Sequence, residues 1–163
     1  MEFWFSEFHT PDVKHSIRVN KQLYSKQSDY QRIDIFETPE FGRVLTLDGN
    51  VMLTERDEFI YDEMIVHVPM AVHKEAKDIL VIGAGDGGVV RELTRYDRVE
   101  RIDLVEMDPQ VVEACRADLP GKFDLFQQTR ELRLVRHVAV RRQRGALQIA
   151  LLQLPLDLHN VFR

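Results

Sequence analysis

The chain has 163 residues, 44% of them hydrophobic and 30% charged, which is typical of a soluble globular protein of one domain or slightly more. The single cysteine excludes an intrachain disulfide, and no apolar run approaches the roughly 18 residues of a membrane span. The formal net charge is -5, but residues 119–163 hold eight basic against three acidic residues, so residues 1–118 are strongly acidic. An acidic body argues against nucleic acid and favours a cationic ligand, although it also simply keeps proteins in solution.

The N-terminus has no basic stretch followed by an apolar one, so we expect no signal peptide. A lone cysteine suits a reducing compartment, and we therefore expect a cytoplasmic protein.

Residues 1–53 are predicted to form a small N-terminal domain, an antiparallel β meander. Alternating apolar and polar residues predict strands over 16–19 and 31–36. Two further strands, 43–47 and 51–53, flank a tight turn at Asp48-Gly49.

A helix is expected to follow, because Thr54 and Asp57 resemble a capping box. Its apolar residues recur about one turn apart and should form the face that packs on the core. They are Phe59, Ile60, Met64, Ile65 and Val68. Pro69 should kink or end this helix.

Residues 54–118 are predicted to begin a Rossmann-like, donor-binding α/β domain. Ile79–Ile82 is typical of a buried parallel strand, a glycine loop follows, and Val90 and Leu93 should point inward from the next helix. A second strand covers 101–106. Asp108 should cap a further helix that has Pro109 at its first position.

After Leu119 the composition turns to Arg, Leu and Gln, and no strand bounded by turn signals is evident. We therefore interpret residues 119–163 as a divergent tail, with an out-of-frame join as one hypothesis. On this interpretation the Rossmann-like sheet is truncated, and the second strand should expose an edge that invites aggregation.

The glycine loop carries the first sign of chemistry. Gly83-x-Gly85-x-x-Gly88 lies between a predicted strand and helix, and Glu106 ends the next strand, where an acidic residue would bind ribose hydroxyls. Nucleoside binding is the prediction, and an ordinary glycine-rich turn is the alternative. Asp86 inside the loop would repel a pyrophosphate but attract a sulfonium or ammonium, which favours an S-adenosyl compound over NAD. Alternatively, Asp86 merely caps the following helix.

A longer series of segments resembles the spermidine synthase family of polyamine aminopropyltransferases, over roughly residues 3–118. The segments are Asp48-Gly49, Thr54 to Met64, His67-Val68-Pro69, Gly83 to Gly88 and Val105 to Asp108. The resemblance is to the N-terminal half of that family.

The resemblance implies two sets of binding residues. Donor or methylthioadenosine binding falls to Gln31, Gly83, Gly85 and Glu106. Polyamine binding falls to Trp4, Tyr61, Asp62 and Asp86. Position 62 departs from the family, in which many members carry His or Gln, and a carboxylate there could still bind an ammonium. The alternatives are a solvent-facing strand residue for Gln31, helix packing for Tyr61 and plain core for Trp4.

The resemblance also implies the reaction, in which an aminopropyl group moves from decarboxylated S-adenosylmethionine to putrescine and methylthioadenosine leaves. The donor is a co-substrate, no other cofactor is expected, and the family suggests a homodimer or tetramer. The six histidines show no metal-ligand spacing, so we expect no metal.

Two family motifs are missing, the Asp-Gly pair on the third strand and the catalytic aspartate motif on the fourth. The catalytic base therefore stays unassigned, and we expect this chain to be incomplete and inactive alone. An S-adenosylmethionine-dependent small-molecule methyltransferase is one alternative, although it would not explain the N-terminal meander. A non-catalytic gene remnant is another.

Overall fold

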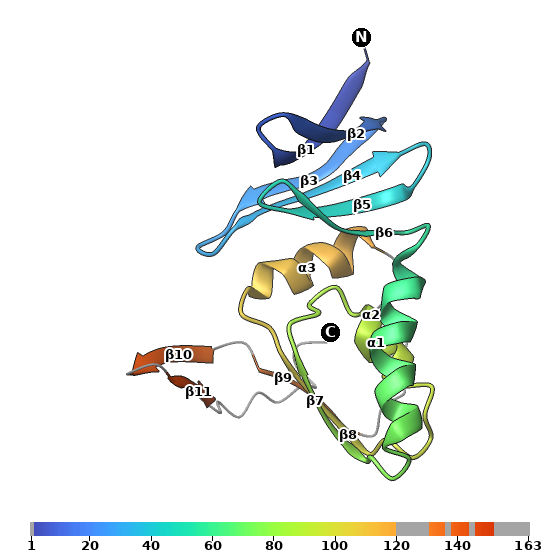
Figure 1. The fold of residues 1–163 in the computed structure, drawn as a ribbon, viewed down its shortest axis with the longest axis vertical. Helices are drawn as coiled ribbons and strands as arrows, with labels where there is room; N and C mark the ends of the chain where they lie inside the picture. The colour runs from blue at the N-terminus through green and yellow to red at the C-terminus, as the bar shows by residue number, and fades with distance from the viewer. Residues whose placement is uncertain (1, 120–130, 136–137, 144–145, 152–163) are drawn as a thin grey trace.

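The computed structural model describes residues 2–119, 131–135, 138–143 and 146–151. Figure 1 shows a β-rich N-terminal part above a mixed α/β part. The elements in chain order are β1 (Phe3–Thr10), β2 (Val13–Val19), β3 (Lys21–Gln27), β4 (Arg32–Thr38), β5 (Gly42–Leu47), β6 (Asn50–Thr54), α1 (Glu58–Val72), β7 (Asp78–Ile82), α2 (Gly88–Leu93), β8 (Arg101–Val105), α3 (Pro109–Asp118), β9 (Glu131–Val135), β10 (Val138–Gln143) and β11 (Ala146–Leu151).

The N-terminal part is an antiparallel hairpin, β1–β2, and a four-stranded antiparallel sheet in the order β3-β4-β5-β6. The predicted meander is therefore confirmed, but β1 and β3 were not predicted. Both are mostly exposed, so their sequences lack the alternation that a half-buried strand produces. The turn between β5 and β6 has positive φ at both Asp48 (50°) and Gly49 (79°), the backbone of a two-residue type I′ hairpin.

Helix α1 begins differently from the sequence prediction. Asp57 is the N-cap, and its side chain accepts no backbone N–H of the helix. The Thr54 hydroxyl donates to the Asp57 carboxylate (2.6 Å), so the two side chains bond to each other instead of forming the predicted capping box. Pro69 lies inside the helix, which continues to Val72, so the helix does not end at Pro69. The Pro69 carbonyl still accepts a bond from the His73 N–H at the C-cap (2.8 Å).

The face of α1 that packs inward is not the one predicted. The buried residues are Asp62, Val66 and Met70, spaced four apart and turned toward α2. The apolar residues expected to face the core are about half exposed or more, for example Met64 at 62%. The amphipathic pattern is present, but its apolar stripe faces outward, so the prediction is wrong.

The parallel sheet has the order β7-β8-β9, with every neighbouring pair parallel. Strand β9 pairs with β8 from Arg101 opposite Glu131 to Val105 opposite Val135. The expectations of no strand after Leu119 and of an exposed β8 edge are therefore wrong. The Arg-rich composition of the tail hid a five-residue strand with leucine at alternate positions.

Strand β7 is an edge strand of this sheet in the described part of the chain, and it is less buried than predicted. Only Val81 is buried, while Leu80 and Ile82 are 57% and 65% exposed. On helix α2, Val90 and Leu93 point inward as predicted, at 0% and 3% exposure.

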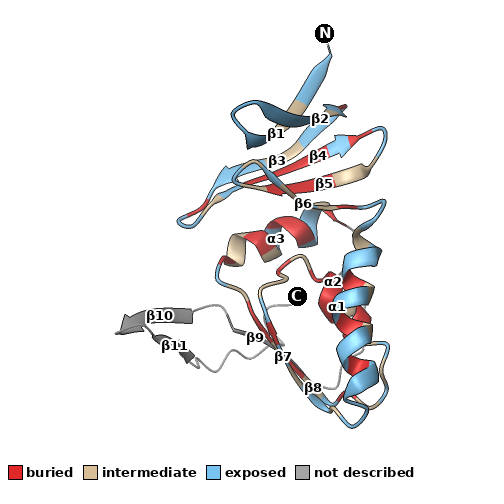
Figure 2. Ribbon diagram, viewed as in Figure 1, coloured by how far each residue is buried: buried red, intermediate tan, exposed pale blue. Residues whose placement is uncertain are grey.

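Two hydrophobic clusters hold these elements together, and Figure 2 shows the buried residues gathered between the layers. The first joins α1 and α2 to β7 and β8, around Val66, Val90 and Ile102. The second lies between the N-terminal sheet and α3, where Ile33 and Ile35 contact the α3 side chains including Cys115. Helix α3 therefore packs on the N-terminal β3-β4-β5-β6 sheet, although it follows the parallel strands β7 and β8 in the chain.

Strands β10 and β11 form an antiparallel pair. Most of the predicted divergent tail, including 120–130 and 152–163, lies outside the described residues. Within the described residues, no helix has the length and hydropathy to cross a bilayer.

Candidate functional site

The glycine loop follows β7 and closes tightly onto the end of β8. The Gly83 N–H donates to the Val105 carbonyl (2.8 Å), and Gly83 has φ of +83°, which an L side chain rarely adopts. The Gly85 N–H donates to Glu106 Oε2 at 3.0 Å, and a Cβ added to Gly85 would lie 2.7 Å from that oxygen. A side chain at position 85 would therefore displace the Glu106 carboxylate, which lies directly against the glycine.

The Glu106 carboxylate joins two turns. While Oε2 accepts from Gly85, Oε1 accepts from the Asp108 N–H at 3.0 Å. Two backbone donors thus fix the carboxylate at the carboxyl end of the parallel strands, where ligands bind in open α/β sheets. The side chain is half-buried, so part of it stays open to a ligand.

Gln31 lies beside this loop because of contacts from the N-terminal sheet. Its Nε2 donates to Asp108 Oδ2 (3.1 Å), and the Ser28 hydroxyl donates to the same oxygen (2.6 Å). The four predicted donor-binding residues, Gln31, Gly83, Gly85 and Glu106, are therefore linked through one loop and one aspartate.

A groove of about 1390 Å³ opens between α1 and β7, next to the glycine loop. Three of the four predicted polyamine-binding residues line it, namely Tyr61, Asp62 and Asp86, whereas Glu106 is not among its lining residues. Among the described lining residues, carboxylates outnumber the basic side chains of Lys77 and His73, which suits a cationic ligand. These carboxylates are Asp57, Glu58, Asp62, Glu75, Asp78 and Asp86.

Asp86 serves the loop as well as the groove. Its Oδ1 accepts the N–H of Gly88, the first residue of α2, at 2.9 Å. The N-cap of α2 is Gly87, so Asp86 bonds to the start of the helix from one position before the cap. Asp86 is half-buried and also lines the groove, so the contact with Gly88 and a contact with a ligand are compatible.

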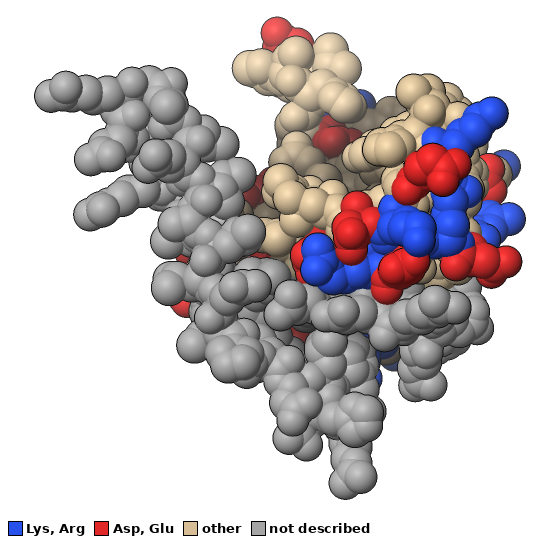
Figure 3. Space-filling view, turned by 90° about the horizontal axis from the view of Figure 1, so that it is seen from below, with Lys and Arg blue, Asp and Glu red and all other residues tan. Residues whose placement is uncertain are grey.

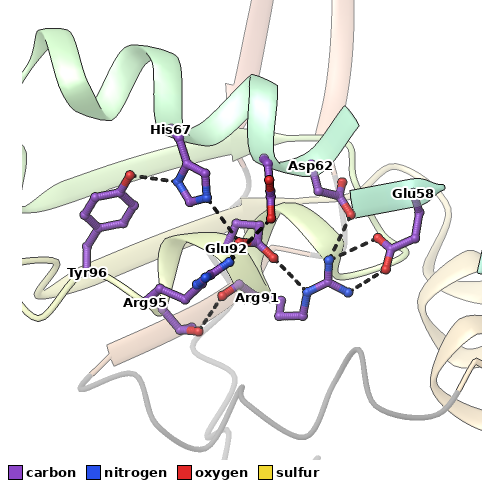
Figure 4. A network of polar contacts seen from close by, with 9 residues as sticks. Glu58, Asp62, His67, Arg91, Glu92, Arg95 and Tyr96 are labelled. Carbon is purple, nitrogen blue, oxygen red and sulfur yellow. Dashed lines mark hydrogen bonds and ion pairs between the residues drawn. The ribbon is translucent and has the colours of Figure 1, made fainter. Parts of the chain in front are cut away.

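Asp62 is buried at the α1–α2 interface, with 3% exposure, and Tyr61 beside it is 66% exposed. Figure 4 shows Asp62 directed toward Arg91, whose Nη2 lies 3.6 Å from Asp62 Oδ2. The same guanidinium donates to both oxygens of Glu58 at 2.7 and 3.2 Å. The carboxylate at position 62 is therefore already paired with a cation.

The charge of Arg91 is secured by its partners. Burial on its own lowers the pKa of the Arg91 guanidinium, but hydrogen bonds to Glu58 and Glu92 outweigh burial and raise that pKa above its usual range. Arg91 thus neutralises part of the negative charge of the groove, at Glu58 and Asp62. Asp86 is the carboxylate that the glycine loop contributes to the groove lining.

The interface continues to His67 and Tyr96. His67 Nδ1 lies 2.7 Å from the Tyr96 hydroxyl, and its Nε2 lies 3.3 Å from Glu92 Oε2 (Figure 4). Glu63, His67 and Glu92 place ligand atoms within 4.8 Å of one another, a grouping that spacing along the sequence did not indicate. Both Glu92 oxygens, however, accept from arginines, Arg91 at 3.0 Å and Arg95 at 2.5 Å. This favours an ion-pair network that joins α1 to α2.

Trp4 lies apart from the other predicted polyamine-binding residues. It is on β1, half exposed, and it lines a smaller hollow of about 300 Å³ with Ile17, Arg18 and Phe41. The structure does not bring Trp4 to the groove, and its role stays a prediction.

The charges of the outer surface are mixed. Figure 3, which views the molecule from below, shows Lys and Arg interleaved with Asp and Glu on one side, beside an uncharged area. Some of these opposite charges form ion pairs on the surface of the protein, as Lys77 Nζ does with Glu100 Oε1 (2.7 Å). On the described part of this face, the basic side chains are distributed among acidic ones.

Two residues of the site were not predicted to act there. Asp108 was predicted only as a helix cap, a role that is confirmed because its Oδ1 accepts the Gln110 N–H (3.0 Å), but its second oxygen reaches Gln31 across 77 positions. Arg91 gave no signal beyond its place in a helix. A buried ion pair between α1 and α2 requires knowledge of how those helices pack.

Comparisons with known proteins agree with this arrangement. The family described as "Spermidine synthase tetramerisation domain" matches residues 3–55, and the one described as "Spermine/spermidine synthase domain" matches residues 58–134. The second match extends into β9, as far as residue 134, beyond the predicted boundary near residue 118. Arg136 and His137, which follow β9, lie outside the described residues.

Curated relatives include the polyamine aminopropyltransferase of Clostridium botulinum (strain Alaska E43 / Type E3), 63% identical over 120 residues, which are 74% of this chain and 42% of the relative. The polyamine aminopropyltransferase of Lachnospira eligens is 60% identical with the same coverage.

Two solved structures resemble the fold at 45% identity over 83% of this chain. One is a spermidine synthase in complex with the transition-state analogue AdoDATO, with a TM-score of 0.78 and 46% of that chain covered. The other is spermidine synthase from Thermotoga maritima, with a TM-score of 0.79 and 48% covered. The chain thus spans about half the length of the relatives it matches.

Proposed function

The chain belongs to the spermidine synthase family over residues 3–134, and from this we propose that it binds decarboxylated S-adenosylmethionine and takes part in aminopropyl transfer to putrescine. The observation that carries the proposal is the junction of the glycine loop and the groove. Glu106 is fixed against Gly85, and the next residue, Asp86, lines an acidic groove beside Tyr61.

In the proposed reaction, the nucleoside lies at the loop. The Glu106 carboxylate accepts hydrogen bonds from ribose hydroxyls, and Gln31 contacts the thioadenosine from the N-terminal sheet. The solved relative with a bound transition-state analogue supports this assignment, because its fold matches this chain with a TM-score of 0.78.

The acidic groove holds the amines. Carboxylates attract both the sulfonium of the donor and the ammonium groups of putrescine, and a low-dielectric wall strengthens that attraction. One amine must lose its proton to attack the carbon next to sulfur, and the new carbon–nitrogen bond forms as the carbon–sulfur bond breaks and methylthioadenosine leaves. Orientation of the two substrates for in-line attack supplies part of the acceleration. The base that takes the proton is not among the residues we assign.

The proposal extends to location and assembly. A cytoplasmic location fits the lone cysteine. A homo-oligomer fits the exposed aromatic side chains of the β1–β2 hairpin, since Phe3, Trp4 and Phe8 are each half exposed or more.

The decisive experiment supplies the purified chain with decarboxylated S-adenosylmethionine and measures methylthioadenosine with and without putrescine. Putrescine-dependent release supports aminopropyl transfer. Isothermal titration with methylthioadenosine separates binding from turnover, and absence of binding at millimolar ligand contradicts the proposed site. Transfer of a methyl group from S-adenosylmethionine to a small acceptor would instead indicate a methyltransferase.

A further inference from the structure

We propose that Asp108 is a positioning residue that holds Gln31 and Glu106 together as one nucleoside-binding unit, an inference that rests on the proposed function. Asp108 has 0% exposure, so it acts through its neighbours. It stands at the start of α3, the helix that packs on the N-terminal sheet, and directly after the end of β8.

The side chain of Asp108 bridges the two parts of the chain. Its Oδ1 accepts the Gln110 N–H (3.0 Å) and caps α3, while Oδ2 accepts from the Ser28 hydroxyl (2.6 Å) and Gln31 Nε2 (3.1 Å). Buried hydrogen bonds to a charged group are the strong ones, and a partner left unpaired costs more than the bond returns. The bridge therefore fixes the turn between β3 and β4 against the end of the parallel sheet.

The Ser28 hydroxyl completes this bridge. It accepts the N–H groups of Tyr30 and Gln31, both at 3.0 Å. Its one hydrogen has two acceptors within reach, Asp108 Oδ2 at 2.6 Å and the Gln31 carbonyl at 3.0 Å, and Asp108 is the nearer. A hydroxyl has one donor and two acceptor positions, so all are used. The backbone that carries Gln31 is thereby tied to the same carboxylate as its side chain.

Asp108 also decides which end of the Gln31 amide faces a ligand. A carboxylate of this kind accepts and does not donate, so the amide nitrogen must face it. The acceptor Oε1 is then the end without this contact, available to an N–H or O–H donor of the nucleoside. On the other side, the Asp108 N–H donates to Glu106 Oε1 (3.0 Å) and restrains that carboxylate.

The test uses Asp108→Asn, which keeps the cap because asparagine and aspartate are equally good N-caps. Its Nδ2 would replace Oδ2 and leave Gln31 Nε2 facing another donor, whereas the Ser28 hydroxyl can turn to the Gln31 carbonyl. Gln31→Met removes the amide at similar size, and the double variant completes a cycle. Asp97→Asn, at an exposed position, is the control for loss of one negative charge.

Isothermal titration with methylthioadenosine should show about tenfold weaker binding for Asp108→Asn, which corresponds to about 1.4 kcal/mol, and no change for Asp97→Asn. The double variant should bind no more weakly than the weaker single variant, because both changes break the same contact. Binding by Asp108→Asn within twofold of the unaltered chain would overturn the inference. So would a double variant whose loss of affinity equals the product of the two single fold-losses.

A measurement without ligand separates this inference from the proposed function. In a ¹⁵N-labelled chain, the Gln31 side-chain amide signal is identified by its disappearance in Gln31→Met. It should shift and exchange faster with solvent in Asp108→Asn. An unchanged signal refutes the inference regardless of ligand. If the unaltered chain binds no methylthioadenosine, the proposed function fails and the amide signal alone decides whether Asp108 holds Gln31.

Discussion

Gly88, at the start of α2, shows how closely α1 and α2 approach each other. A Cβ added there would lie 1.8 Å from Asp62 Oδ2, well inside any contact distance. Asp62 has little room to move, because it is buried and paired with Arg91. The glycine at 88 is thus required by packing, whereas the one at 83 is required by its backbone angle.

We expect Gly88→Ala to cost about 1–3 kcal/mol of the free energy of unfolding through overpacking, measured by urea denaturation. Adding Asp62→Ala should recover part of that loss because it removes the clashing carboxylate. Gly49→Ala is the matched control, since its Cβ would meet nothing within 4 Å and only the positive φ is strained. A double variant Gly88→Ala/Asp62→Ala that recovers none of the loss would contradict the packing argument.

Sequence reasoning at the residue scale succeeded where the signal was local. The cap at Asp108 and the glycine loop with Glu106 follow from short spacings and the context of a strand and a helix. The links from Asp108 to Gln31 and from Arg91 to Asp62 join distant segments, so no local pattern encodes them.

Among the elements, α1 separates two kinds of apolar surface. Its buried face meets α2, and its exposed apolar face lines the groove, so periodicity alone predicted the helix but selected the wrong face. A ligand groove and a core both favour apolar side chains, which is why sequence cannot tell them apart. Strand β9 was missed for a different reason, because a basic tail obscured a short alternating run.

The same substitution on the two faces of α1 tests this assignment. Met70→Ala should cost about 2–5 kcal/mol, as truncation of a buried methionine usually does. Met64→Ala, at 62% exposure, should change the free energy of unfolding by less than about 0.5 kcal/mol. If denaturation shows a large loss for Met64→Ala, that face is covered in solution.

The contribution of the α1–α2 contact to the free energy of unfolding should depend on pH, because Glu92 titrates. Burial raises the pKa of Glu92, but hydrogen bonds from Arg95 and Arg91 outweigh it and hold the pKa below the ordinary value of 4.5. A carboxyl group whose pKa is lowered by folding stabilises the folded state above its ordinary pKa. That contribution is lost as pH falls through the lower folded value.

Glu92→Gln should therefore destabilise the chain most near neutral pH, with a smaller difference from the unaltered chain below pH 4.5. Urea denaturation at several pH values measures this. Glu100→Gln, in an exposed pair with Lys77, should have little effect at any pH. A Glu92→Gln deficit that grows on acidification would contradict the sign.

On the scale of the whole molecule, the described residues offer two surfaces for association between copies of the chain, the β1–β2 hairpin and the outer edge of β7. Phe8 on the hairpin is 65% exposed, and Leu80 on β7 is 57% exposed. Unpaired strand edges and apolar patches both promote association. The family description of residues 3–55 as a tetramerisation domain favours the hairpin.

We expect Phe8→Lys to lower the oligomeric state measured by light scattering, while Leu80→Lys leaves it unchanged. A charge on the contact face must be desolvated to associate, which is costly. The opposite result would assign association to the β7 edge. Unaltered thermal unfolding of both variants would exclude loss of the fold as the cause.

The packing of α3 on the N-terminal sheet also determines where this polypeptide can be divided. A fragment that begins after β6 would keep α3 but leave Val111, Ala114 and Cys115 facing water, and it would lose Ser28 and Gln31 from the loop. The sheet alone would expose Ile33 and Ile35 in turn. The two halves should therefore melt as a single cooperative unit, and neither is a suitable separate module for grafting or swapping between relatives.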